Sequence, residues 1–145
     1  MKSITFYFED IKPLDLKEKS ILKGLKLIIE DKNCEAGEIS VIFCSDDYLL
    51  EMNKTYLNHD YYTDIITFDY VDKNVISGDL FISTDRVKEN AEGIGSTFTK
   101  ELYRVVFHGV LHLVGYKDKT DEEQKEMTKM EDYYLSKIDF NGVEV

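Results

Sequence analysis

Hydrophobic and polar residues alternate in several short runs of the chain. Residues 4–8 and 38–44 show the period of two that is typical of β-strands. Two further strand-like runs, residues 65–70 and 79–83, flank residues 71–78, whose Asp, Lys and Asn suit a turn. We therefore predict about four strands, of which the last two form a hairpin.

Helical spacing of apolar residues fills most of the remaining chain. Asp15 is predicted to cap a helix that ends near Glu30, and Ser45 to cap a shorter helix. After Thr84 the pattern is helical to the end, with glycine-containing breaks at 93–96 and 115–119. The last helix begins with a capping box, Thr120 and Glu123, and its apolar positions are Met127, Met130, Tyr134 and Ile138.

These elements predict a single α+β domain over residues 1–145, with a mixed sheet of about four strands packed with about five helices. No stretch approaches the length of about 18 apolar residues that a membrane span needs, so we expect a cytoplasmic protein. The net charge of -11 argues against nonspecific binding of nucleic acid over a broad surface. The spacing of Cys34 and Cys44 suggests two reduced thiols.

Residues 99–114 form the most unusual segment, because apolar residues surround nearly the whole predicted helix and so indicate a buried one. His108 and His112 lie four residues apart in it, which places both imidazoles on one face. Gly115 predicts a turn after the helix, and Asp118 is the first carboxylate beyond it. Two imidazoles and one carboxylate favour a catalytic zinc site with an open coordination position.

Alternatives remain for this cluster. Asp121 and Glu122 are competing third ligands, although acidic residues also suit the first turn of the last helix. The two histidines could instead be packed core residues. A zinc protease is disfavoured because Gly109 stands where its general base, a glutamate, would follow the first histidine.

Three motifs in order resemble a known family. Residues 108–116, HGVLHLVGY, resemble the H-G-x-L-H-L-x-G-Y signature of the YbeY family, bacterial endoribonucleases linked to ribosomal RNA maturation. Residues 63–68, TDIITF, and 78–82, GDLFI, resemble two further strands of that family. The resemblance implies a metal-dependent endoribonuclease that acts on single-stranded RNA, processes the 3′ end of small-subunit ribosomal RNA and serves ribosome quality control.

The chain departs from the family pattern twice. The family usually has Asp-His after the signature, whereas this chain has Lys117 and Asp118, so the implied ligand set becomes His108, His112 and Asp118. We expect one zinc ion per chain, with other divalent metals as alternatives. An arginine associated with catalysis in the family is replaced by Leu57, and His59 is no obvious substitute.

Several other residues are candidates for the RNA site. Arg104 lies one helical turn before His108 and is predicted either to reach a phosphate or to form an exposed pair with Glu101. From their place in the family motifs, Asp64, Thr67 and Asp79 are expected to line the cleft. Three tyrosines are candidates for stacking on bases or for plain packing: Tyr61, Tyr62 and Tyr116.

Two other functions compete with the nuclease. One is a metal-dependent hydrolase of peptides or esters. The other is a metal-stabilised ribosome assembly factor without catalysis, which the acidic charge favours. As partners we expect ribosomal RNA, the small ribosomal subunit and assembly proteins, and no membrane.

Overall fold

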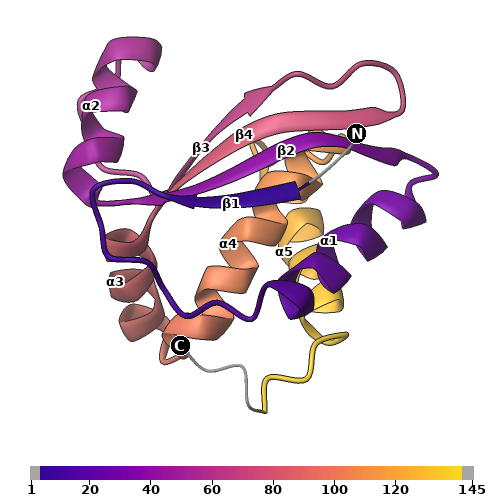
Figure 1. The fold of residues 1–145 in the computed structure, drawn as a ribbon. Helices are drawn as coiled ribbons and strands as arrows, with labels where there is room; N and C mark the ends of the chain where they lie inside the picture. The colour runs from indigo at the N-terminus through magenta and orange to yellow at the C-terminus, as the bar shows by residue number, and fades with distance from the viewer. Residues whose placement is uncertain (1–3, 142–145) are drawn as a thin grey trace.

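The structure, a computed structural model, describes residues 4–141 of the chain. It contains four strands and five helices (Figure 1), in agreement with the α+β class predicted from the sequence. In chain order they are β1 (Ile4–Phe8), α1 (Glu18–Asp31), β2 (Glu35–Cys44), α2 (Asp46–Leu57), β3 (Ile65–Asp69), β4 (Val75–Ser83), α3 (Thr84–Ile94), α4 (Phe98–Leu113) and α5 (Asp121–Leu135).

The strands form one mixed sheet in the order β1-β2-β4-β3. β1, β2 and β4 are parallel, whereas β3 runs antiparallel to β4 as the other arm of the predicted hairpin. β3 is therefore an edge strand, and its outer side is left open by the sheet. In the hairpin register, Thr67 lies opposite Leu80 and Phe68 opposite Asp79. Because side chains alternate between faces, these two pairs point to opposite sides of the sheet.

α4 lies beneath the sheet, with α1 and α5 on the same side and α2 on the other (Figure 1). Most of its residues are buried, as the apolar character of this segment predicts. Gly109 allows the helix to approach the strands closely: a Cβ atom there would lie 2.8 Å from Ile65 Cδ1 and 2.9 Å from both Leu80 Cδ atoms. The second half of α4 is thereby held against β3 and β4.

Several boundaries differ from the prediction. α1 begins at Glu18 after Lys17 rather than being capped by Asp15. β2 begins at Glu35 and β4 at Val75, so the loop between the last two strands is shorter than expected. These first strand residues pair with each other before an irregularity between Ala36 and Ile39, and this pairing between distant segments is invisible to local alternation.

The predicted caps elsewhere are confirmed. Ser45 accepts a hydrogen bond from Tyr48 N at the start of α2, and Thr120 and Glu123 form the capping box of α5.

No helix within residues 4–141 is long and apolar enough to cross a membrane. Both cysteines are free thiols, and burial raises the pKa of Cys44 to about 12.

Gly109→Ala is expected to lower the free energy of unfolding. Crowding in a packed core costs about 1–3 kcal/mol, which exceeds the gain of up to about 1 kcal/mol from replacing a helical glycine. Gly93→Ala in α3 is the matched control, because nothing lies within 4 Å of a Cβ there and only the helical gain applies. Urea denaturation of both variants tests this, and a stabilising Gly109→Ala would contradict the close approach.

Candidate metal centre

α4 carries both cluster histidines on the part of its surface that the core leaves uncovered. The side chains of His108 and His112 are 22% and 29% exposed, while Gly109, Val110 and Leu111 between them are buried. The two imidazole centroids lie 4.8 Å apart in an edge-to-face arrangement. The helix therefore holds two imidazoles side by side at the border between core and solvent.

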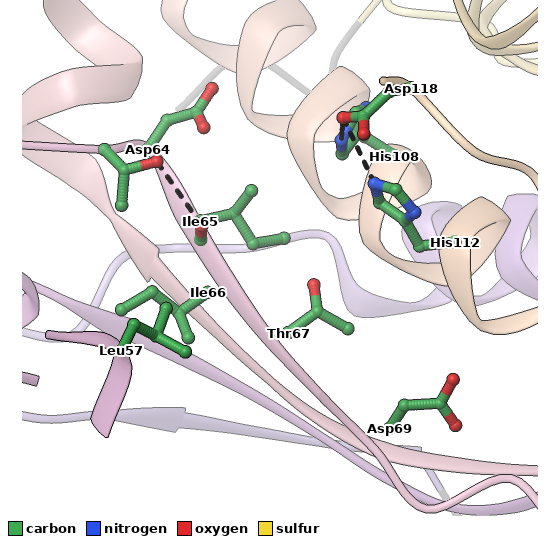
Figure 2. Close-up of a pocket in the computed structure, with 10 residues that line it drawn as sticks. Leu57, Asp64, Ile65, Ile66, Thr67, Asp69, His108, His112 and Asp118 are labelled. Atoms are coloured by element: carbon green, nitrogen blue, oxygen red, sulfur yellow. Dashed lines mark hydrogen bonds and ion pairs between the residues drawn. The ribbon is translucent and has the colours of Figure 1, made fainter. Parts of the chain in front are cut away.

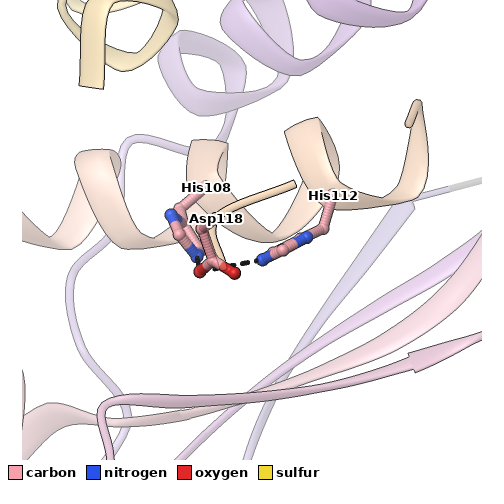
Figure 3. A group of neighbouring side chains, drawn as sticks. All are labelled: His108, His112 and Asp118. Atoms are coloured by element: carbon pink, nitrogen blue, oxygen red, sulfur yellow. Dashed lines mark ion pairs between the residues drawn. The ribbon is translucent and has the colours of Figure 1, made fainter. Parts of the chain in front are cut away.

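The turn after α4 brings a carboxylate close to the two histidines. Gly115 adopts a φ of 112°, a conformation that side chains disfavour, and Tyr116 N donates to Leu111 O at 3.0 Å. The chain reverses, and the Asp118 carboxylate lies between the two rings (Figure 3). Its Oδ2 is 3.3 Å from His108 Nε2 and 3.2 Å from His112 Nε2.

These distances suit a shared metal ion. Two donors that each lie about 2.0–2.1 Å from a tetrahedral zinc ion are about 3.3 Å apart, and nitrogen and carboxylate donors are those zinc accepts. One ligand atom from each of His108, His112 and Asp118 lies within 4.8 Å of the others. The competing candidates Asp121 and Glu122 are in the first turn of α5 and outside this group. The donor set therefore fits a divalent metal.

A fourth residue, Glu131 of α5, contacts the cluster and was not predicted from the sequence. Its Oε2 lies 2.7 Å from His108 Nδ1, and the residue is only 6% exposed. Burial by itself would lower the pKa of His108, but Glu131 and Asp118 outweigh it and the pKa is raised. The sequence did hold a signal, because Glu131 interrupts the buried stripe of Met127 and Tyr134 with a charge.

Arg104 pairs with Glu101, as one of its two predicted roles requires, but Glu101 is buried and two acidic residues of α5 bind Arg104 as well. Its Nε lies 3.4 Å from Glu101 Oε1, and its Nη1 is 3.2 Å from Glu131 Oε1 and 2.9 Å from Asp132 Oδ1. Three carboxylates thus surround the guanidinium. It lies beside the metal cluster but is engaged within the protein.

A cleft of about 420 Å³ lies between the cluster and the edge strand β3 (Figure 2). Thr67, on β3, faces it as expected, and so does Asp64. Burial raises the pKa of the Asp64 carboxyl, and the nearby His108 opposes that rise. None of the described residues lining the cleft is Lys or Arg. The described residues that line the cleft are Leu57, Thr63, Asp64, Ile65, Ile66, Thr67, Asp69, His108, His112 and Asp118.

Asp79 does not line this cleft, so that expectation is wrong. It pairs with Phe68 in the hairpin register and therefore points to the face of the sheet that carries α2. There it lines a separate pocket with Tyr56 and Phe81. The motif predicted that Asp79 belongs to a strand, but not which face of the sheet it occupies.

The three candidate tyrosines have different surroundings. Tyr61 and Tyr62 are 51% and 50% exposed in the segment that precedes β3. Tyr116 is partly buried against the core, and Lys32 Nζ lies 4.4 Å from the centre of its ring. Only the first two leave substantial ring surface to solvent.

Comparisons with known proteins agree with these observations. A family model described as Endoribonuclease YbeY matches residues 8–139. A protein of Parabacteroides distasonis named endoribonuclease YbeY is 47% identical over 92% of this chain and 94% of its own length. One of the same name from Cytophaga hutchinsonii is 48% identical over 90% of this chain and 93% of its own. A solution structure from Thermotoga maritima matches 92% of this chain and 87% of its own, with 31% identity and a TM-score of 0.63.

Removal of cluster side chains is expected to remove bound metal. We predict that His112→Ala abolishes stoichiometric metal and that Asp118→Asn weakens it, because each is one of the three candidate protein ligands. Elemental analysis of untagged protein measures the metal content. His59→Ala is the matched control, since this third histidine contacts Tyr61 and lies outside the cluster. Full metal content in a His112→Ala, Asp118→Asn double variant would refute the ligand assignment.

Proposed function

Because this chain belongs to the YbeY family of endoribonucleases, we propose that it hydrolyses phosphodiester bonds of single-stranded RNA with the help of a divalent metal. The observation that carries the proposal is the convergence of His108, His112 and Asp118 at an open cleft. The substrate proposed is ribosomal RNA, with processing of the small-subunit 3′ end and ribosome quality control as the role.

The ligand set determines what the site does chemically. His108, His112 and Asp118 would hold the metal ion, which would supply Lewis-acid chemistry toward a phosphate oxygen and a water molecule. Three protein donors leave a position open for this chemistry. On the opposite wall, the Thr67 hydroxyl is available to donate a hydrogen bond to a phosphate or ribose oxygen. The Asp64 carboxyl, with its raised pKa, stands on the same wall.

Charge restricts how RNA enters. Asp64, Asp69 and Asp118 line the cleft, and no Lys or Arg is among the described lining residues. The phosphates of an RNA strand would therefore find no basic side chain there to pair with. In this proposal, contacts between aromatic side chains and RNA bases compensate for the missing contacts between basic side chains and phosphates. Tyr61 and Tyr62 are about half exposed in the segment that leads into β3, and aromatic side chains stack on unpaired bases of any sequence. A single strand, whose bases are free, therefore suits the site better than a duplex.

We propose in addition that one zinc ion is bound per chain and that the protein works in the cytoplasm. The small ribosomal subunit and its assembly proteins are the proposed partners. Processing of ribosomal RNA would take place on that particle, where assembly proteins supply the basic surface that this acidic chain lacks.

RNA cleavage assays test the function directly. Metal-loaded wild type is expected to cleave a labelled single-stranded RNA and to leave a duplex of the same sequence intact, whereas Asp118→Ala loses at least about 100-fold in rate. Gly93→Ala in α3, which does not line the cleft, should keep wild-type activity. Metal-loaded wild type that cleaves no RNA, or that cleaves peptides or esters in its place, would contradict the proposal.

Leu57→Arg is expected to strengthen RNA binding. Leu57 lines the cleft, so an added guanidinium would supply the phosphate contact that is missing there. The slope of log affinity against log salt concentration should steepen by about one unit for each additional phosphate that the protein neutralises. Fluorescence anisotropy with a non-cleavable RNA analogue measures both the affinity and its salt dependence.

The control for this variant is Tyr7→Arg. Tyr7 is exposed on β1, at the opposite edge of the sheet from β3, and receives the same charge far from the cleft. An equal gain in affinity for both variants would show a nonspecific effect of net charge and contradict a phosphate path along Leu57.

A further inference from the structure

We propose that Glu131 is a positioning residue for the metal centre. In this inference, which rests on the proposed function, Glu131 fixes His108 in the tautomer that offers Nε2 to the metal, and Arg104 holds Glu131 in place. Neither residue reaches the reacting atoms. Both act through the orientation of one ligand.

The first step of the argument is the hydrogen bond itself. Glu131 Oε2 lies 2.7 Å from His108 Nδ1, and the two residues come from different helices, α5 and α4. An ionised carboxylate can only accept a hydrogen bond, so Nδ1 must carry the proton. The lone pair of a neutral ring is then on Nε2, which is the nitrogen that faces Asp118 Oδ2 at 3.3 Å.

The second step concerns the stability of a buried carboxylate. Glu131 is 6% exposed, and an uncompensated charge at that depth is costly. Arg104 supplies the compensation, because its Nη1 lies 3.2 Å from Oε1, the oxygen that does not contact His108. Each carboxylate oxygen thus has its own partner on α4. The geometry leaves the carboxylate little freedom to rotate away from the imidazole.

The third step is the difference between the two histidines. Within residues 4–141, no carboxylate is hydrogen-bonded to Nδ1 of His112, so the proposed restraint applies to His108 alone. Carboxylates bound to metal-ligating histidines typically improve metal affinity about 10–100-fold by fixing tautomer and ring orientation. An effect of that size should be specific to Glu131.

Zinc affinity measured by competition with a chromogenic chelator provides the first test. Glu131→Gln is expected to weaken zinc binding about 10–100-fold relative to wild type. Asp132→Asn is the matched control: it removes a carboxylate that also binds Arg104, at 2.9 Å, but does not touch His108. Its affinity should stay within about threefold of wild type. Equal affinities for wild type and Glu131→Gln, or equal losses for both variants, would overturn the proposal.

Nitrogen NMR of the histidine side chains is the second test and needs no variant. In metal-free wild type at a pH where the rings are neutral, His108 is expected to be protonated at Nδ1. The Nε2-protonated form, or an even mixture of tautomers, would overturn the proposal even if zinc binds. If wild type instead binds no zinc, the proposed function fails, while the tautomer still decides the role of Glu131. Glu131→Asp, which keeps the charge but shortens the side chain, replaces Glu131→Gln if that variant does not fold.

Discussion

The packing of α4 against the sheet is the constraint on which the other features of this protein depend. Gly109 lets the helix backbone approach Ile65 and Leu80, and its position between His108 and His112 sets how far the imidazoles stand from β3. A larger residue would displace the helix and both histidines together. The core and the candidate metal centre therefore share one helix, with the buried face supplying rigidity and the remaining strip carrying two candidate ligands.

Acidic side chains outnumber basic ones around the exposed strip of this helix. Glu101, Glu131, Asp132 and Asp118 all lie near the histidines or Arg104. Without cations such a group would repel itself, so the arrangement depends on Arg104 at one end and suits a divalent metal at the other. The aspartate that replaces the family's usual histidine adds one more negative charge to this group. That negative charge would strengthen the binding of a metal ion and would weaken the attraction between this ion and a phosphate.

Much of the fold could be predicted from local pattern. The apolar helix, the capping box, the glycine stop and the hairpin all follow from interactions between residues close in sequence. His108 and His112 were predicted together for the same reason, since a helix alone places them on one face. Asp118 was predicted as the third candidate because the turn at Gly115, which brings it back to the histidines, is also local.

Contacts between distant segments are what the sequence alone left undecided. Local alternation could not show that Asp79 points to the far face of the sheet, because the same pattern fits either face until β3 and β4 pair. It could not show that Arg104 is held by α5 or that Glu131 supports His108, because α4 and α5 meet only when the core forms. Local hydrogen bonds and periodicity determined the kinds and order of the elements and the three candidate ligands, whereas burial across the sheet and between helices decided which other charged side chains meet.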